Sequence, residues 1–194
     1  MEERELTKDE SFDLIIKMIH NARTNLRAKI NSRILLLWGY MAVGVSLILF
    51  ALNLVHLNFN FSSLLWLSVP LVSYPFSLYL VRKEKMKEKT FLDRLIDYIT
   101  ILFVILCIIV AFSTLWVSSP VFYIEGLLIS TWIIIIGLMV KYKKIIGGGI
   151  IGIILSHTLL FITSPSYQTL LFASILITTI IIPGHLFKSA ISKK

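Results

Sequence analysis

Two ionisable side chains interrupt long apolar stretches in the second half of the chain, the carboxylate of Glu125 and the imidazole of His157. An ionisable group at membrane depth is expensive to bury, and this makes it a candidate for a functional site. At a rise of about 1.5 Å per helical residue, Glu125 lies about 7–8 Å beyond Pro120, and His157 lies about 10–11 Å before Ser164. The similar depths predict a Glu125–His157 pair on consecutive antiparallel helices, where a shared proton or neutralised charge would lower the cost of burial.

Three interpretations of this polar site remain open. Glu125 could reach towards the membrane interface as a snorkelling or protonated side chain. It could form a purely structural pair with His157, or the two residues could bind a ligand or carry a proton. Three aromatic residues at comparable or shallower depth, Tyr123, Trp116 and Trp66, complete the candidate ligand-binding group.

The sequence does not carry the residue patterns of the common catalytic and metal sites. A third ligand at the depth of Glu125 and His157 is missing, so we do not expect a zinc site. Ser156-His157 lacks the nucleophile elbow of a serine hydrolase, and Gly147-Gly148-Gly149 is followed by aliphatic residues, unlike a phosphate-binding loop. We therefore predict a non-enzymatic protein that uses no metal or cofactor.

The composition predicts an all-α integral membrane protein. The 194 residues are 57% hydrophobic and 15% charged, with a mean hydropathy of +0.85, and a soluble domain of this size could not bury so much apolar surface. The single Cys107 excludes a disulfide framework within one chain. The hydropathy pattern predicts a transmembrane bundle over residues 34–187, between a polar N-terminal segment, 1–33, and a short basic tail, 188–194. Its six spans are expected at about 34–55, 64–81, 99–117, 121–140, 145–163 and 168–186.

The distribution of Lys and Arg predicts the orientation of these spans. All 19 basic residues fall in the N-terminal segment, the connection between spans 2 and 3, the turn between spans 4 and 5, and the tail. The three intervening loops contain none, so both termini are expected in the cytosol. The net charge of +8 is then explained by topology, and direct binding to nucleic acid is not expected. The same charge could attract anionic lipid head groups.

The N-terminal segment predicts an amphipathic cytosolic helix over residues 7–33. Thr7 and Glu10 fit a capping box, and apolar residues then recur at spacings of three and four. This stripe could rest on the membrane surface or on the bundle, or it could contact a cytosolic protein or a second copy of the chain. The residues expected at such a partner interface are Phe12, Ile15, Ile19 and Leu26.

Two features predict how the last three spans pack. The turn Lys141-Tyr142-Lys143-Lys144 is so short that spans 4 and 5 must form an antiparallel hairpin. On span 5, Gly148, Gly152 and Ser156 lie four residues apart, a ridge of small side chains that lets another helix approach closely. In span 6, Pro183-Gly184 is expected to interrupt the helix near its cytosolic end.

Part of the chain resembles a known group of proteins. The run from Glu10-Ser11 through Ile15-Ile16 and Asn25-Leu26 to Leu36-Leu37-Trp38-Gly39-Tyr40 is similar to an uncharacterised family of small six-helix bacterial inner-membrane proteins. The resemblance covers about the first fifty residues and carries no catalytic residues across. It implies a multi-pass protein of the bacterial cytoplasmic membrane that is the partner of a cytosolic regulator.

Two functions are therefore considered. The first is a regulatory or scaffolding membrane protein that couples a bundle with an outer polar pocket to a cytosolic partner. The second is a small-solute transport or substrate-binding subunit, because the chain is similar in size to the substrate-binding subunits of energy-coupling-factor transporters. A regulator predicts a stable cytosolic partner, whereas a transport subunit predicts stabilisation by its solute.

Overall fold

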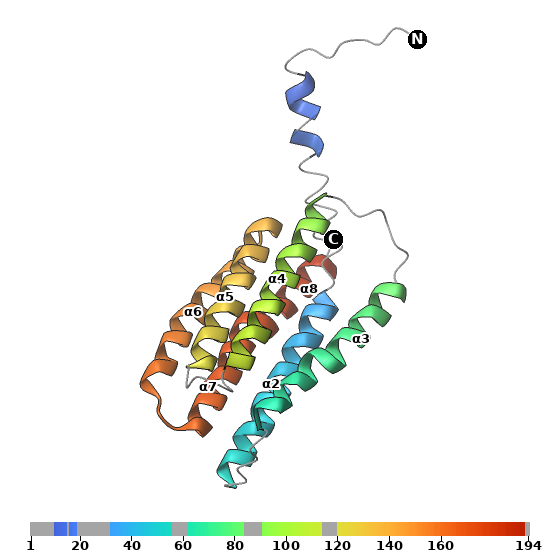
Figure 1. The fold of residues 1–194 in the computed structure, drawn as a ribbon. Helices are drawn as coiled ribbons and strands as arrows, with labels where there is room; N and C mark the ends of the chain where they lie inside the picture. Colours follow the sequence, from blue (N-terminus) through green and yellow to red (C-terminus); the bar gives the residue numbers. More distant parts are fainter. Residues whose placement is uncertain are drawn as a thin grey trace.

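The computed structural model describes residues 10–14, 16–18, 32–55, 62–83, 91–113 and 120–192, and within these ranges every regular element is helical. The predicted all-α class is therefore confirmed for this part of the chain. After the helical residues 10–14 and 16–18, the elements are α2 (Ser32–Leu54), η1 (Ser62–Leu67), α3 (Ser68–Lys83), α4 (Phe91–Ser113), α5 (Val121–Val140), α6 (Lys143–Thr158), η2 (Leu159–Phe161), α7 (Pro165–Leu176), η3 (Ile177–Ile181) and α8 (Ile182–Ser192) (Figure 1).

Within the described residues, five helices are long and apolar enough to cross a membrane. They are Arg33–Leu54, Arg94–Ser113, Val121–Val140, Lys143–Phe161 and Pro165–Ala190. A sixth apolar helix, Leu65–Leu80, is shorter. The chain thus has the helices of a multi-pass membrane protein, and it carries them at the positions where the hydropathy predicts spans.

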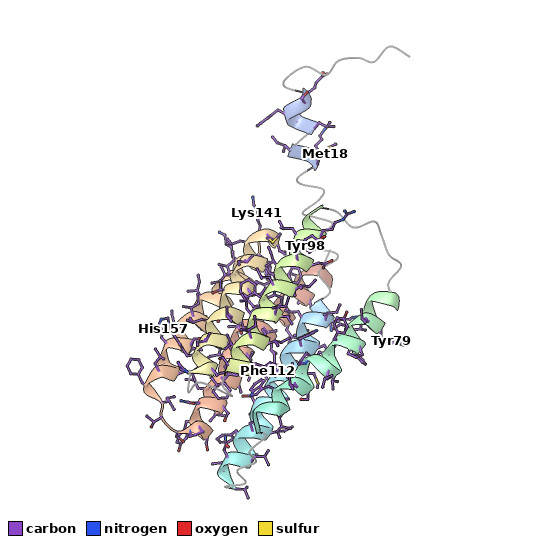
Figure 2. All side chains as sticks on the ribbon, in the orientation of Figure 1. Met18, Tyr79, Tyr98, Phe112, Lys141 and His157 are labelled. Atoms are coloured by element: carbon purple, nitrogen blue, oxygen red, sulfur yellow. The ribbon has the colours of Figure 1, made fainter. Side chains whose placement is uncertain are left out.

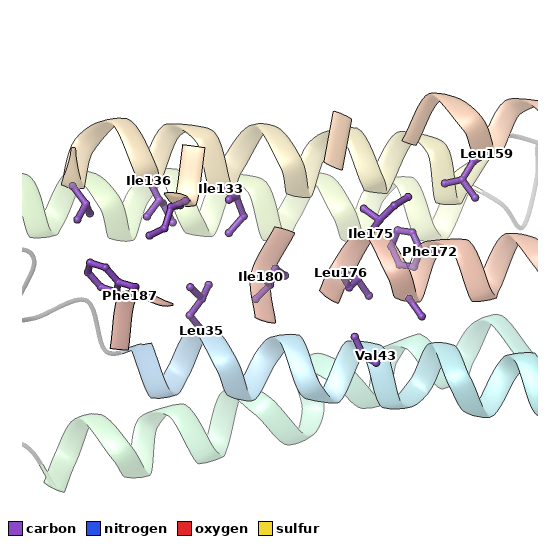
Figure 3. Packing of buried hydrophobic residues seen from close by; sticks show 13 residues of the cluster. Leu35, Val43, Ile133, Ile136, Leu159, Phe172, Ile175, Leu176, Ile180 and Phe187 are labelled. Carbon is purple, nitrogen blue, oxygen red and sulfur yellow. The ribbon is translucent and has the colours of Figure 1, made fainter. Parts of the chain in front are cut away.

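The C-terminal run α7–η3–α8 is the centre of the bundle. It packs against α2, α5 and α6, and half of the residues in its most apolar stretch are buried. Figure 3 shows Phe172, Ile175 and Leu176 between the ribbons of α2 and α5, where all three are almost fully buried. Residues of α2, α5 and α6 such as Val43, Ile133 and Ile145 complete this core.

The predicted interruption at Pro183 is wrong, because the helical run passes through it and continues to Ser192. Proline has no N–H to donate, so it leaves a carbonyl of the preceding turn without its usual partner. The chain widens into a π-helical turn, Ile177–Ile181, and the N–H of Ile182 donates to the carbonyl of Ile177. The wider turn shifts the hydrogen-bond register just before Pro183, so the helix continues.

Two helices lie at the periphery. Helix α4 packs on α5, and none of the residues in its most apolar stretch is buried. Helix α3 packs on α2 and contains Pro75 without ending there. Both helices direct large apolar side chains outward, including Leu71 and Ile109, which are 72% and 58% exposed. Surfaces of this kind are costly in water but natural against lipid.

The described basic residues of the bundle gather at one end. Helix α2 begins and α8 ends at this end, as Figure 1 shows, and Tyr40 of α2 contacts His185 of α8 through a 2.6 Å hydrogen bond between the phenol oxygen and Nε2. Lys141 and Tyr98 lie towards the same end in Figure 2, whereas Phe112 lies towards the other. The basic residues at this end are Arg33, Arg82, Lys83, Arg94, Lys141, Lys143, Lys144 and Lys188.

The N-terminal helical segment, residues 10–14 and 16–18, lies clear of the bundle, beyond the basic end (Figure 1). Its large apolar side chains Phe12, Leu14, Ile16 and Met18 are all exposed. The part of the expected helix that is described therefore does not pack on the bundle. Ile15, Ile19 and Leu26 of the predicted interface lie outside the described residues.

Candidate functional site

The turn between α5 and α6 determines how the two helices face each other. Lys141 adopts a left-handed conformation with φ 53°, and the N–H of Tyr142 donates to the carbonyl of Gly137 at 3.0 Å. This pattern closes α5 with a Schellman motif and turns the chain back within two residues. Tyr142 also donates from its hydroxyl to the carbonyl of Leu186 and packs its ring against Phe187, so the turn is fastened to α8.

Small residues set the register of this hairpin. A Cβ added to Gly126 would lie 2.5 Å from the Oγ of Ser156, and one added to Gly152 would collide with Ser130 and Thr179. Each of these contacts joins residues whose positions are level on antiparallel helices. Glu125 and His157, one residue before Gly126 and one residue after Ser156, are level as well, as their predicted depths require.

The predicted Glu125–His157 pair is nevertheless not formed. Gly126 and Ser156 occupy the contact line between α5 and α6, and each helix turns by about 100° per residue. The neighbouring positions therefore turn away from this line. Neither a hydrogen bond nor an ion pair joins the carboxylate of Glu125 to His157, and both residues lie in the described part of the chain.

His157 instead lies on the exposed side of α6. Its Nδ1 is 2.9 Å from the carbonyl oxygen of Ile153, one turn earlier, to which it donates as the Nδ1–H tautomer. Its ring meets the ring of Tyr123 edge to face, with the ring centroids 5.4 Å apart. The imidazole is therefore held by its own helix and by an aromatic neighbour.

Glu125 lies on the side of α5 that meets α4. Two turns further along, the indole Nε1 of Trp132 donates to the Oγ1 of Thr100 on α4 at 3.2 Å. Counting seven residues back on α5 and seven forward on α4 brings Glu125 level with Cys107. Among the described residues, the carboxylate has neither a hydrogen bond nor an ion pair.

The aromatic residues of the candidate site divide between two groups. Tyr123 contacts His157, whereas Trp66 packs in a cluster with Phe122 and Phe172, whose ring centroids lie 6.1 and 5.4 Å from its own. This cluster joins η1 to α5 and α7. Trp116 lies outside the described residues.

The small-residue ridge lies between helices. Gly148 faces Pro183 and the carbonyl of Thr178, while Gly152 and Ser156 face α5. Sequence reasoning missed the complementary residues on α5, Gly126 and Ser130, although they too are spaced by four. Ser130 is fully buried, and its hydroxyl lacks a hydrogen-bond partner.

The position of Cys107, level with Glu125, was also not predicted, although the sequence contains a signal for it. The loop that joins α4 to α5 is short, so residues equally far from its middle must face each other across an antiparallel hairpin. Position 107 then opposes position 125. Within the described residues, three or more His, Cys, Asp or Glu side chains do not come together as a metal site would require.

Comparisons of this chain with protein families, with curated proteins and with solved structures found no match.

Proposed function

We propose that this chain is a non-enzymatic, regulatory or scaffolding protein of the bacterial cytoplasmic membrane, with six membrane spans and both termini in the cytosol. The observation that carries the proposal is the N-terminal helical segment, residues 10–14 and 16–18, which lies beyond the basic end of the bundle with its described large apolar side chains exposed (Figure 1). The positive-inside rule assigns the basic end to the cytosol. The exposed segment is then presented to cytosolic proteins.

Six crossings are supported by the path of the chain. Because α2 begins and α8 ends at the same end of the bundle, the number of crossings is even. The run of η1 and α3 has 6 and 16 residues. At about 2.0 Å and 1.5 Å per residue it extends roughly 36 Å, enough for a hydrocarbon core of about 30 Å. The shorter helix therefore serves as the sixth span.

A partner for the N-terminal segment is supported by the surface that it exposes. Phe12 and Met18 are 65% and 61% exposed, and Leu14 and Ile16 lie between them. Removing each such side chain from water contributes about 1.5–3 kcal/mol, so an interface or a membrane surface is the favourable environment for them. In the proposed regulatory or scaffolding role, the N-terminal segment couples the bundle to this partner.

The test compares proteins cross-linked to the wild type in intact cells with those cross-linked to a Phe12→Asp/Ile16→Asp variant. These two side chains lie one turn apart, and charges there should abolish a specific partner or a self-association band while membrane insertion stays unchanged. A Phe12→Leu/Ile16→Leu variant, which keeps the apolar surface, is the matched control. Identical cross-linked products in wild type and the Asp variant would refute the proposal.

A small-solute transport or substrate-binding subunit is the second candidate. The observation that favours it is the carboxylate of Glu125, which lacks a hydrogen bond and an ion pair among the described residues and faces a peripheral helix. A transport subunit predicts flux of a solute into proteoliposomes, which a scaffold does not. Flux that disappears in Glu125→Gln would favour this second function.

A further inference from the structure

Helices α2 and α8 form an antiparallel contact with a defined register at the basic end of the bundle (Figure 1). A Cβ added to Gly39 would lie 2.8 Å from Cγ2 of Ile180, and one added to Gly184 would lie 2.9 Å from Cδ2 of Leu36. Residues equally far from these contacts therefore lie at the same level on the two helices.

Two cationic side chains share a level at the basic end of this contact. Arg33 lies three residues before Leu36, and Lys188 lies four residues after Gly184, so their levels differ by about 1.5 Å. Both side chains are exposed. Neither α2 nor α8 contains Asp or Glu, and among the described residues Lys188 has no ion pair. The two helices thus supply no counter-charge of their own.

A hydrogen-bonded pair shows which way these cations face. Tyr40 and His185 directly follow the two glycines of the contact, and their phenol oxygen and Nε2 are 2.6 Å apart, so both side chains turn to the same side. Arg33 precedes Tyr40 by seven residues, nearly two full turns, and Lys188 follows His185 by three. Four polar side chains therefore gather on one side of the α2–α8 contact.

The Tyr40–His185 pair keeps a donor for a further partner whichever way its proton lies. If the phenol donates to Nε2, the imidazole carries its own hydrogen on Nδ1 and can donate it elsewhere. If Nε2–H donates to the phenol oxygen, the phenol O–H remains free to donate. Two cations and one available hydrogen-bond donor are the groups that a phosphate prefers.

Helix α2 continues the same side into the apolar part of the bundle. Leu47 and Leu54 follow Tyr40 at intervals of seven residues, and they are 45% and 57% exposed. Along this side the order is cation, tyrosine and aliphatic residues. The same order is found in a phospholipid, whose charged head group lies at the membrane surface and whose acyl chains lie below it.

We propose that the side of the α2–α8 contact defined by Arg33, Tyr40, His185 and Lys188 binds an anionic phospholipid. The phosphate lies between the two cations and accepts the hydrogen bond that the Tyr40–His185 pair has available, and one acyl chain lies along the exposed leucines of α2. A free phosphate has no group to cover these leucines. This inference rests on the proposed membrane-spanning arrangement and requires no cytosolic partner.

The test uses the full chain, purified in a non-ionic detergent and stripped of lipid, and native mass spectrometry measures the lipid that it retains. The probes are dioleoylphosphatidylglycerol, which is anionic, and dioleoylphosphatidylcholine, which has the same acyl chains and no net charge. We expect saturable binding of one phosphatidylglycerol per chain. Phosphatidylcholine should bind at least about 10-fold more weakly, since each cation contributes about a factor of five. Millimolar inorganic phosphate should not displace the lipid.

Variants identify the site. Lys188→Gln and Arg33→Gln should each bind phosphatidylglycerol about 5-fold more weakly, because each loses one charge. Tyr40→Phe, which keeps the ring and loses the hydroxyl, should bind about 3- to 10-fold more weakly. Arg94→Gln is the matched control, because it removes an exposed cation from the same end of the bundle but from α4, which packs on α5. This control should bind normally.

Equal retention of the two lipids would overturn the proposal. Displacement of phosphatidylglycerol by inorganic phosphate would also overturn it, because a free anion would then be the ligand. Equal losses in Lys188→Gln and Arg94→Gln would mean that the attraction is spread over the whole basic end and would exclude a defined site. If a variant does not fold, the comparison of the two lipids on the wild type decides. The measurement does not use the N-terminal segment, so its failure is distinct from a failure of the regulatory function.

Discussion

The carboxylate of Glu125 and the imidazole of His157 lie level on α5 and α6, but each meets a different neighbour. His157 is held by the carbonyl of Ile153 and by the ring of Tyr123. Glu125 lies level with Cys107, on the side of α5 that meets α4. The burial cost of the carboxylate is therefore not reduced by the histidine, and the two residues should act independently.

The first prediction is that Glu125→Gln and His157→Gln have additive effects on the free energy of unfolding in detergent. The effects of mutations at residues without a shared partner on the free energy of unfolding usually add to within about 0.5 kcal/mol. A control cycle with Tyr123→Leu and His157→Gln should show coupling of about 0.5–1.5 kcal/mol, because these two rings are in contact. Coupling above about 1 kcal/mol between Glu125 and His157 would contradict the observed geometry.

The levels of these two side chains could be predicted from the sequence, but their directions could not. The rise per residue is constant, so counting from Pro120 and from Ser164 places the two residues at similar levels. The direction of each side chain depends on which residues form the contact line between α5 and α6. Moving by one position along a helix rotates the side chain by about 100°. Gly126 and Ser156 occupy that line because they are small. The four-residue spacing of Gly126 and Ser130 was the available signal.

Helix α6 approaches its neighbours closely through two adjacent glycines that differ in their surroundings. A Cβ on Gly148 would lie 2.5 Å from Cγ of Pro183 and 2.9 Å from the carbonyl oxygen of Thr178, whereas a Cβ on Gly147 would have no neighbour within 4 Å. The first position thus determines how closely α6 and the π-helical turn of the central run can approach.

The second prediction compares Gly148→Ala with Gly147→Ala. The first should lower stability by about 1–3 kcal/mol, since a backbone carbonyl must move. The second should leave stability unchanged or raise it by up to about 1 kcal/mol, because alanine favours the helix. Thermal unfolding in one detergent measures both. Similar losses in the two variants would mean that the close approach at Gly148 has no special importance.

The third prediction concerns the attachment of α3. Trp66 links η1 to Phe122 and Phe172, while Trp38 of α2 donates a 3.0 Å hydrogen bond to Ser77 of α3. Trp66→Leu should cost about 2–4 kcal/mol and increase hydrogen exchange in α3 more than in α2. Trp38→Phe, which removes one hydrogen bond, should cost about 1 kcal/mol. Unchanged exchange in α3 after loss of Trp66 would contradict this account.

On the scale of the whole molecule, hydropathy predicts the helices and their order better than it predicts which helix is central. The run α7–η3–α8 contains the longest of the five long apolar helices of the described residues, and this helix is also the most buried of them. In lipid, exposed and buried positions are equally apolar, so the sequence contains little signal for centrality. The π-helical turn before Pro183 was unpredictable for a related reason, because a proline alone does not reveal how the backbone accommodates it.

The last prediction tests the topology of the whole chain. The only cysteine, Cys107, is replaced by serine, and single cysteines are introduced at one position each, Pro120, Ser164, Lys141 and Lys188. In intact cells, a membrane-impermeant maleimide should label Pro120→Cys and Ser164→Cys, because both lie at the end remote from the basic residues. Lys141→Cys and Lys188→Cys should react only after the membrane is permeabilised.

Val55→Cys and Arg94→Cys, on either side of α3, should report opposite compartments because that helix crosses the bilayer. Labelling of both from the same side would leave α3 on one surface and would contradict the six-span arrangement.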